Sequence, residues 1–164
     1  MNLNLNSKKV LITGSSRGIG LAVAESFLQE GAKTCIVSRG SKALFENEKR
    51  LQGVYGLENI FACKCDCTNV ESLNSLKNNI ESKWNSLDIV IVNVGDGRSV
   101  SDVLPDDEQW KKIWNSNFES ALQTARTFLP MLKESQGVLL FVSSIAGMEA
   151  FGAPTDYSTA KSAI

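Results

Sequence analysis

The sequence predicts an α/β fold built on a doubly wound parallel sheet. Five short apolar runs alternate along the chain with segments of helical periodicity. The apolar runs are nearly continuous, as expected for strands whose two faces are both covered by helices. Right-handed crossovers between such strands give a parallel sheet. The 164 residues suffice for one domain with a sizeable core, so residues 1–164 are expected to form a single domain.

Each expected element has its own signal. The strands are expected over residues 9–13, 34–37, 59–65, 88–93 and 138–142. The helices are expected over 19–30, 41–51, 68–84 and 105–129, and a last helix begins near Pro154. Gly31 is placed to end the first helix, and Thr68 with Glu71 fits a capping box at the start of the third. The helix from Pro105 has an acidic first turn, which suits the helix dipole, and a wide apolar stripe.

Composition excludes several classes of partner. Lys and Arg total 17 against 18 Asp and Glu, for a formal net charge of -1, so nothing favours binding to nucleic acid or an anionic membrane. No apolar run approaches the roughly 20 residues of a membrane helix. The first residues lack the basic start and apolar core of a signal peptide. We therefore expect a cytoplasmic protein with no nucleic-acid or membrane partner.

The four cysteines are expected to be core residues. Cys63, Cys65 and Cys67 alternate along a predicted strand, which puts them on one face, and Cys35 lies in another strand. A zinc site usually draws on wider cysteine spacing and further ligands, and the chain has no histidine. The sequence therefore predicts no metal site and reduced thiols in a reducing compartment.

A glycine-rich turn joins the first strand to the first helix. It reads Thr13-Gly14-Ser15-Ser16-Arg17-Gly18-Ile19-Gly20. Glycines allow a sharp turn and a close approach to a pyrophosphate, and the helix presents free N–H groups to the phosphates. Glycines also mark ordinary turns, but the position between a buried strand and a helix favours a nucleotide site.

The glycine spacing and four later motifs resemble the short-chain dehydrogenase/reductase family, especially its 3-oxoacyl-[acyl-carrier-protein] reductases. The later motifs are Asn93-Val94-Gly95, Asn117, Ser143-Ser144 and the Tyr157-x-x-x-Lys161 pair. The resemblance covers the whole chain. It implies a Rossmann-type sheet in the order 3-2-1-4-5, NAD(P)-dependent oxidoreductase activity and a homo-oligomeric full-length protein, a dimer or tetramer. It also implies that the family fold continues past Ile164, with further strands that this chain lacks.

The predicted catalytic residues are Asn117, Ser144, Tyr157 and Lys161. Tyr157 and Lys161 are four apart in a predicted helix and share a face. A free tyrosine has a pKa near 10, and a neighbouring ammonium favours its phenolate, so Tyr157 is expected to act as acid and base. By resemblance, Ser144 bonds the reacting oxygen, Lys161 also binds the nicotinamide ribose, and Asn117 holds a water in a proton relay. Taken singly, each residue also fits an ordinary surface or capping role.

The expected cofactor is NADP(H) rather than NAD(H). An NAD site usually has an acid at the end of the second strand, whereas this chain has Ser38 and Arg39 there. Arg39, aided by Arg17, suits a 2′-phosphate, although both arginines also fit a solvated surface. Asp66 and Cys67 should flank the adenine. The residues expected to bind the cofactor are Gly14, Ser16, Arg17, Gly18, Ile19, Gly20, Ser38, Arg39, Asp66, Cys67, Asn93, Val94, Gly95, Tyr157 and Lys161.

Some features leave alternatives open. Val94 replaces the alanine usual in the family motif, which adds bulk beside the cofactor. The polar segment after Gly95 fits a solvated loop or a loop in which Asp96 or Arg98 contacts a polar substrate. The substrate is expected to be a small carbonyl or alcohol compound, with sugars, polyols and steroids open beside oxoacyl thioesters. The chain is read as a fragment, a truncated product or an incomplete part of a longer protein, inactive by itself. A nucleotide-binding module without turnover is the alternative function.

Overall fold

A five-stranded parallel sheet forms the centre of the chain in the computed structural model, which describes residues 3–100, 102–149 and 152–164. The strands are β1 (Lys9–Thr13), β2 (Lys33–Ser38), β3 (Ile60–Lys64), β4 (Ile89–Val92) and β5 (Val138–Phe141). They lie in the order β3-β2-β1-β4-β5, and each neighbouring pair is parallel. The predicted doubly wound sheet and its strand order are confirmed.

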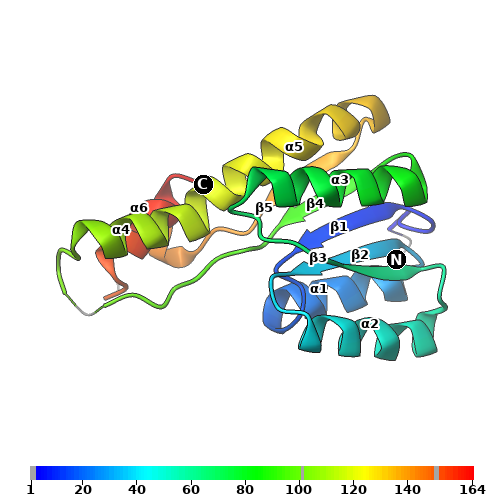
Figure 1. Cartoon of the computed structure of the whole chain (residues 1–164), viewed down its shortest axis with the longest axis horizontal. Coiled ribbons are helices and arrows are strands. Elements are labelled where there is room, and N and C mark those ends of the chain that lie inside the picture. Colours follow the sequence, from blue (N-terminus) through cyan, green and yellow to red (C-terminus); the bar gives the residue numbers. More distant parts are fainter. Residues whose placement is uncertain (1–2, 101, 150–151) are drawn as a thin grey trace.

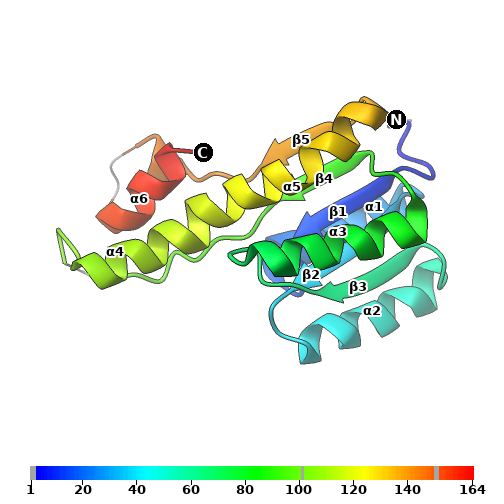
Figure 2. The ribbon, with the colours of Figure 1, turned by 45° about the horizontal axis from the view of Figure 1, so that its top comes forward.

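Helices cover both faces of this sheet. One face carries α1 (Gly18–Gln29) and α2 (Lys42–Tyr55), and the other carries α3 (Val70–Trp84) and α5 (Ser120–Ser135) (Figures 1 and 2). The helix α2 continues past the predicted end at Leu51, because no helix-breaking geometry occurs before Gly56, which has a φ of 96°. None of the helices in the described ranges is long and apolar enough to cross a membrane.

Two further helices lie beyond the carboxyl ends of the strands. These are α4 (Asp107–Trp114) and α6 (Thr155–Ser162), which contact each other (Figures 1 and 2). A 3₁₀ turn, Ile145–Gly147, packs against α6. This arrangement brings the last predicted motif of the chain to the same end of the sheet as the glycine turn.

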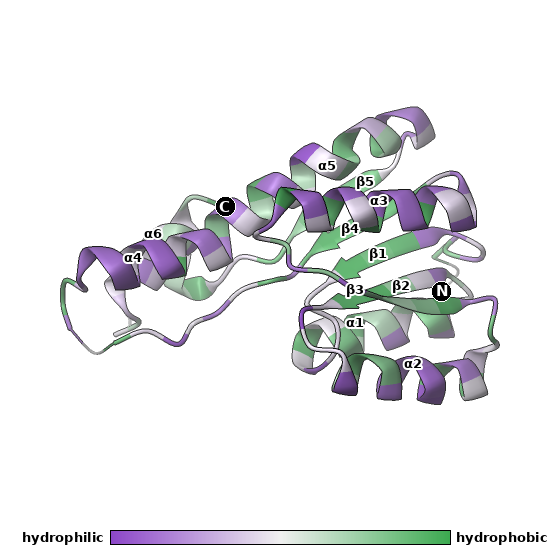
Figure 3. Cartoon of the chain, viewed as in Figure 1, coloured by the Kyte–Doolittle hydropathy of each residue, from purple (hydrophilic) through white to green (hydrophobic). Residues whose placement is uncertain are grey.

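Alternate residues of the inner strands pack into two separate hydrophobic cores, one on each face of the sheet. In β1, Leu11 packs with the α3 and α5 side, whereas Val10 and Ile12 pack with the α1 and α2 side. All three are fully buried. Figure 3 shows the strands as hydrophobic and the outer faces of the helices as mixed or hydrophilic. The two-sided burial explains why the inner strands are almost continuously apolar.

The edge strand β5 is more exposed than the inner strands. It pairs with β4, and its Val138, Leu140 and Phe141 side chains keep 54%, 46% and 39% of their accessible surface. An apolar strand edge of this kind is able to pair with a further strand.

The start of α3 differs from the prediction. Asn69, not Thr68, caps the helix, and its side chain accepts a hydrogen bond from the Ser72 N–H at 2.7 Å. The Thr68 hydroxyl instead donates to Asp66 Oδ1 at 2.8 Å. The capping box predicted from Thr68 and Glu71 is therefore wrong, because Asn69 competes for the cap and Asp66 binds the Thr68 hydroxyl.

The long helix predicted over 105–129 is divided by a change of helical pitch. It begins at Asp107, after an Asp106 cap, and changes from α4 to a π-helix at Asn115–Glu119 before continuing as α5. Asn117 lies in this π-helical segment. Such wide turns are frequent at functional sites, and periodicity alone does not show them.

The four cysteines are buried free thiols in the core between the sheet and α3 with α5. Asn79 of α3 donates a weak hydrogen bond to Cys63 Sγ at 3.9 Å. Across the described ranges, no group of three or more His, Cys, Asp or Glu side chains is arranged to hold a metal ion.

Candidate active site

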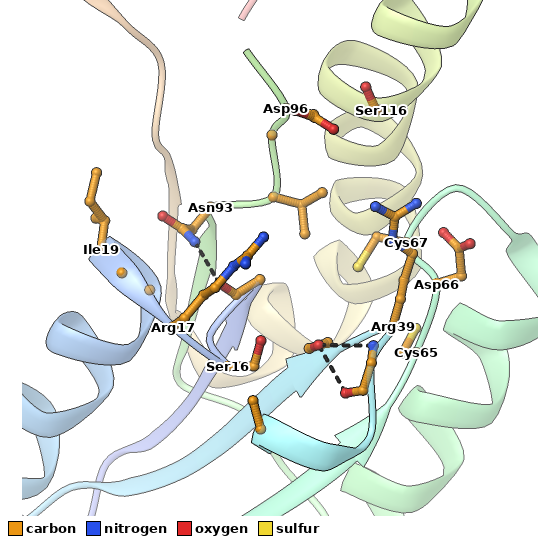
Figure 4. A pocket seen from close by; sticks show the side chains of 18 of the residues that line it. Ser16, Arg17, Ile19, Arg39, Cys65, Asp66, Cys67, Asn93, Asp96 and Ser116 are labelled. Carbon is orange, nitrogen blue, oxygen red and sulfur yellow. Dashed lines mark hydrogen bonds between the residues drawn. The ribbon is translucent and has the colours of Figure 1, made fainter. Parts of the chain in front are cut away.

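A cleft of about 820 Å³ lies at the carboxyl ends of the first four strands (Figure 4). This is where open parallel sheets bind their ligands. All the residues predicted to bind the cofactor line the cleft, apart from Tyr157 and Lys161. The predicted residues in the lining are Gly14, Ser16, Arg17, Gly18, Ile19, Gly20, Ser38, Arg39, Asp66, Cys67, Asn93, Val94 and Gly95.

The glycine turn forms one wall of the cleft. Gly14 and Gly18 have φ angles of 66° and 58°, which favour glycine. A Cβ on Gly20 would lie 2.6 Å from both the Gly14 oxygen and Asn93 Nδ2, so α1 packs against the turn without room for a side chain. No side chain caps the N-terminus of α1, whose N–H groups are left for an anion. The residues fit a bound pyrophosphate.

Hydrogen bonds lock this turn to the neighbouring strands. The Ser15 hydroxyl donates to the Ile12 oxygen at 2.6 Å and accepts from the Val37 N–H at 2.8 Å. Asn93, at the end of β4, donates from Nδ2 to the Thr13 and Gly14 oxygens at 3.0 and 3.2 Å. The predicted Asn93 therefore holds the shape of the turn.

Two arginines reach into the cleft from opposite sides. Figure 4 shows Arg17 extending from the glycine turn and Arg39 from the end of β2. Burial raises the pKa of Asp66, and local hydrogen bonds and then the charge of Arg39 lower it. The bonds and charge of Arg98 and, less strongly, the charge of Arg39 lower the pKa of Asp96. Arg39 therefore lies between two loops of the cleft, where its planar guanidinium suits a phosphate.

The residues that come directly after β3 form another wall of the cleft. Asp66 Oδ1 accepts hydrogen bonds from the Thr68 N–H at 3.0 Å and the Thr68 hydroxyl at 2.8 Å. Burial alone would raise the pKa of Asp66, but these bonds and Arg39 lower it overall. Asp66 is thus an ionised acceptor at the position predicted to flank the adenine.

The chain also places residues in the cleft that the sequence did not single out. Lys42, the first residue of α2, adds a third cation to the lining, and its place three residues after Arg39 was a usable signal. Ser116, next to Asn117, reaches the cleft because of the π-helical turn. The other unpredicted lining residues are Gly40, Ser41, Ala43, Cys65 and Thr68, while Asp96, which the sequence offered as a substrate contact, also lines the cleft.

The predicted pair Tyr157 and Lys161 lies on α6, one turn apart. Lys161 is 5% exposed, and its Nζ donates to the Val142 oxygen at 2.9 Å. Burial lowers the pKa of the Lys161 ammonium below its ordinary value. The ring of Tyr157 lies beside Gly97, where a Cβ would be 3.5 Å from the nearest ring carbon.

Gly95 is the point where the cleft meets the predicted catalytic residues. It lines the cleft, and a Cβ on it would lie 2.9 Å from Asn117 Oδ1 and 3.1 Å from Lys161 Nζ. The side chains of Asn117 and Lys161 therefore approach the same backbone position. A Cβ there would crowd the Asn117 amide, so glycine allows this close approach.

Asn117 is fully buried and bound to the loop after β4. Its Nδ2 donates to the Asp96 oxygen at 3.0 Å, and its Oδ1 accepts from the Asp96 N–H at 3.1 Å. The π-helical turn presents this amide to the loop. The bonds fix the loop beside Lys161.

Ser144 lies at the start of the 3₁₀ turn, and its hydroxyl accepts from the Ala146 N–H at 3.2 Å. Within the described part of the chain, this hydroxyl bond is a cap and does not join Ser144 to Tyr157. The structure thus brings Asn117, Lys161 and the cleft together, and it places Tyr157 one helical turn from Lys161 without a direct bond to Ser144.

Asp96 and Arg98 pair with each other. Arg98 donates from Nε and Nη2 to the two carboxylate oxygens of Asp96 at 2.9 and 2.8 Å. The hydrogen bonds from the Arg98 side chain are the largest cause that holds the pKa of Asp96 below its usual range. Both side chains that the sequence offered to a polar substrate are joined in one bidentate ion pair at the mouth of the cleft.

Comparisons with known proteins find relatives over almost the whole chain. The chain is 34% identical over 167 residues to the uncharacterized oxidoreductase YvrD of Bacillus subtilis (strain 168), covering 100% of this chain and 61% of that protein. It is 27% identical to the 3-oxoacyl-[acyl-carrier-protein] reductase MabA of Mycobacterium avium, over 96% of this chain and 57% of MabA. The chain therefore spans about three fifths of the length of these relatives.

A solved structure shows the same architecture. L-sorbose reductase from Gluconobacter frateurii, complexed with NADPH and L-sorbose, superposes with a TM-score of 0.92 at 28% identity, over 99% of this chain and 62% of that one. Residues 8–164 match the family described as short chain dehydrogenase. The chain belongs to the short-chain dehydrogenase family.

Proposed function

We propose that the protein containing this chain transfers a hydride between NADP(H) and a carbonyl or secondary-alcohol substrate. The observation that carries the proposal is the junction at Gly95, where the nucleotide cleft touches Asn117 and Lys161. A cleft alone fits any nucleotide-binding protein. The end of this cleft also holds the amide of Asn117 and the buried Lys161, which lies on the same helix as Tyr157. These are groups that proton transfer requires.

The proposed chemistry gives each residue a separate task. When bound, the nicotinamide supplies or accepts the hydride. In reduction, the Tyr157 phenol donates a proton to the carbonyl oxygen, and in oxidation its phenolate removes the alcohol proton. Lys161 favours the phenolate by its charge and binds the ribose, and Asn117 holds a water of the proton relay. The Ser144 oxygen accepts from the Ala146 N–H, which leaves the Ser144 hydroxyl proton to donate to the substrate oxygen.

NADP(H) is proposed over NAD(H) because of the charges at the adenosine end. Arg39 follows Ser38 at the end of β2, where an NAD site usually has a carboxylate. Arg17 and Lys42 line the same cleft. Three cations lining one cleft suit a cofactor that carries an extra phosphate, and the solved L-sorbose reductase complex contains NADPH.

For the substrate we propose a 3-oxoacyl thioester as the first class to test, supported by the resemblance to MabA. Sugars and steroids are the competing classes, since similar structures include L-sorbose reductase and a 7α-hydroxysteroid dehydrogenase. We also propose that the full-length protein is a cytoplasmic homo-oligomer, a dimer or tetramer. Light scattering on the purified protein would measure the oligomeric state.

The test is an assay of the protein that contains this chain, following NADPH loss with oxoacyl thioesters, ketoses and oxosteroids. Turnover with one class and tighter binding of NADPH than NADH would support the proposal. Binding of NADPH without turnover of any carbonyl would favour the alternative, a nucleotide-binding module. Residues 1–164 expressed alone are expected to bind the adenosine half weakly and to show no turnover, because the relatives are longer and β5 has an exposed edge.

A further inference from the structure

The loop between β4 and α4 is tied to three different helical elements. Asp96 exchanges two hydrogen bonds with Asn117 of the π-helix. Gln109 of α4 donates from Nε2 to Ser99 Oγ at 3.2 Å. Thr155 of α6 donates its hydroxyl to the Val103 oxygen at 2.7 Å. The described part of this loop is therefore fixed on the helices and is not a freely solvated connection.

Asp156, the residue before Tyr157, forms a further link between this loop and α6, through Ser99. It is 1% exposed. One carboxylate oxygen, Oδ2, accepts from the Ser99 hydroxyl at 2.5 Å, and the other, Oδ1, accepts from the Tyr157 N–H at 2.7 Å. Both oxygens thus have donors, which offsets the cost of burying the carboxylate.

These two bonds link the backbone of Tyr157 to the loop after β4. Oδ1 of Asp156 binds the backbone of Tyr157, while Oδ2 binds Ser99, in the loop whose Gly97 lies against the Tyr157 ring. Gln109 supports Ser99 from α4. A chain of bonds therefore joins α4, the loop and the first turn of α6, and the Tyr157 ring lies against Gly97 of this loop.

We propose that Asp156 is a positioning residue that, through Ser99, sets where the Tyr157 phenol lies relative to the substrate. This inference rests on the proposed function. Its physical reason is distance: a misplacement of about 1 Å in a reacting group costs on the order of a hundredfold in rate. Asp156 itself is buried and does not line the cleft, so it acts through Tyr157 and the loop.

The experiment compares Asp156→Ala, Asp156→Asn and Ser99→Ala in the protein that contains this chain. Asp156→Ala should lower kcat by about tenfold to a hundredfold, with NADPH affinity unchanged because the glycine turn is untouched. Asp156→Asn should retain most of kcat. Its amide oxygen still accepts from the Tyr157 N–H, and the Ser99 hydroxyl can accept from the new amide. A purely structural role would lower kcat and NADPH affinity together.

Ser99→Ala keeps the proposal testable if Asp156→Ala does not fold, because it removes only the loop side of the link. It should lower kcat by at least about threefold, and the double variant with Asp156→Ala should be no worse than Asp156→Ala alone. Unchanged kcat in both single variants would overturn the proposal. So would an Asp156→Asn variant as impaired as Asp156→Ala.

Amide hydrogen exchange tests the link through Asp156 and Ser99 independently of the proposed function. Ser99→Ala should speed exchange at the Tyr157 amide, and Asp156→Ala should speed exchange in residues 95–100, whether or not the protein turns over a carbonyl. An unsubstituted protein without turnover would contradict the proposed function, while the exchange data would still decide whether the link exists. Unchanged exchange in both segments would overturn the link.

Discussion

The side-chain nitrogen of Lys161 donates a hydrogen bond to the main-chain oxygen of Val142 across 2.9 Å, which joins α6 to the residue after β5. The contact holds an ammonium group in a site that is 5% exposed. A neutral carbonyl replaces only part of the hydration that the charge loses. The fold therefore keeps a costly charge beside Gly95, at the end of the cleft.

This cost should appear in the pH dependence of stability. Burial lowers the pKa of Lys161 from its ordinary 10.5, so the unfolded chain binds more protons than the folded chain between the folded-state pKa and 10.5. The free energy of unfolding then rises with pH through that window. Lys161→Met should remove this rise and stabilise the chain by about 1 kcal/mol at neutral pH.

Urea unfolding of the two chains at several pH values would measure the effect. The exposed Lys111→Met on α4 is the control, and its pH dependence should match that of the unsubstituted chain. A Lys161→Met chain that is markedly less stable at neutral pH would contradict a net cost of the buried charge.

Tyr157→Phe should remove turnover in the protein that contains this chain. The phenol supplies the proton, whereas the glycine turn binds the nucleotide, so kcat should fall by at least about a hundredfold with NADPH affinity unchanged. Tyr55→Phe changes the only other tyrosine and should leave kcat unaltered. A Tyr157→Phe enzyme within a few-fold of the unsubstituted kcat would exclude Tyr157 as acid and base.

Arg39→Leu should weaken NADPH binding and leave NADH binding unchanged. A charge-assisted hydrogen bond contributes about 1.5–3 kcal/mol, which corresponds to roughly a 10- to 100-fold loss for NADPH. Side-by-side titration of both nucleotides would measure it, with the exposed Arg126→Leu on α5 as the control. Equal affinities, or tighter NADH, in the unsubstituted protein would refute the proposed preference.

The sheet and the nucleotide cleft followed from local features of the sequence. A buried run such as Val10 to Ile12 needs cover on both faces, which forces helices to alternate with strands. Residues directly after such strands, including Gly14 and Asn93, then meet at one edge of the sheet. Neither step requires knowledge of distant contacts.

The links around α6 depend on distant contacts and did not follow from the sequence. Ser99 and Asp156 are 57 residues apart, and no local pattern pairs them. The π-helical turn that directs Asn117 to the loop has the same apolar periodicity as an α-helix over so short a stretch. The cap by Asn69 was missed for a different reason, since Thr68 and Asn69 are both good caps and the Asp66 contact decides between them.

Two helical glycines should respond in opposite ways to alanine. A Cβ on Gly20 in α1 would lie 2.6 Å from the Gly14 oxygen, a backbone atom that moves only if the turn deforms. Gly20→Ala should therefore lower the free energy of unfolding by about 1–3 kcal/mol and weaken nucleotide binding. A Cβ on Gly53 in α2 would have no atom within 4 Å apart from its chain neighbours and the backbone of its own helix. Gly53→Ala should raise the free energy of unfolding by about 0.5–1 kcal/mol, because alanine favours the helix.

Urea unfolding of both variants would measure the two opposite changes in the free energy of unfolding, and NADPH titration would measure nucleotide affinity. The pair is matched because each change adds one methyl group to a glycine within a helix. Gly53→Ala should leave nucleotide affinity unaltered, since Gly53 does not line the cleft. If Gly20→Ala were as stable as the unsubstituted chain and bound NADPH equally well, the close packing of α1 on the glycine turn would be wrong. The fit of the turn to a pyrophosphate would then lose its main support.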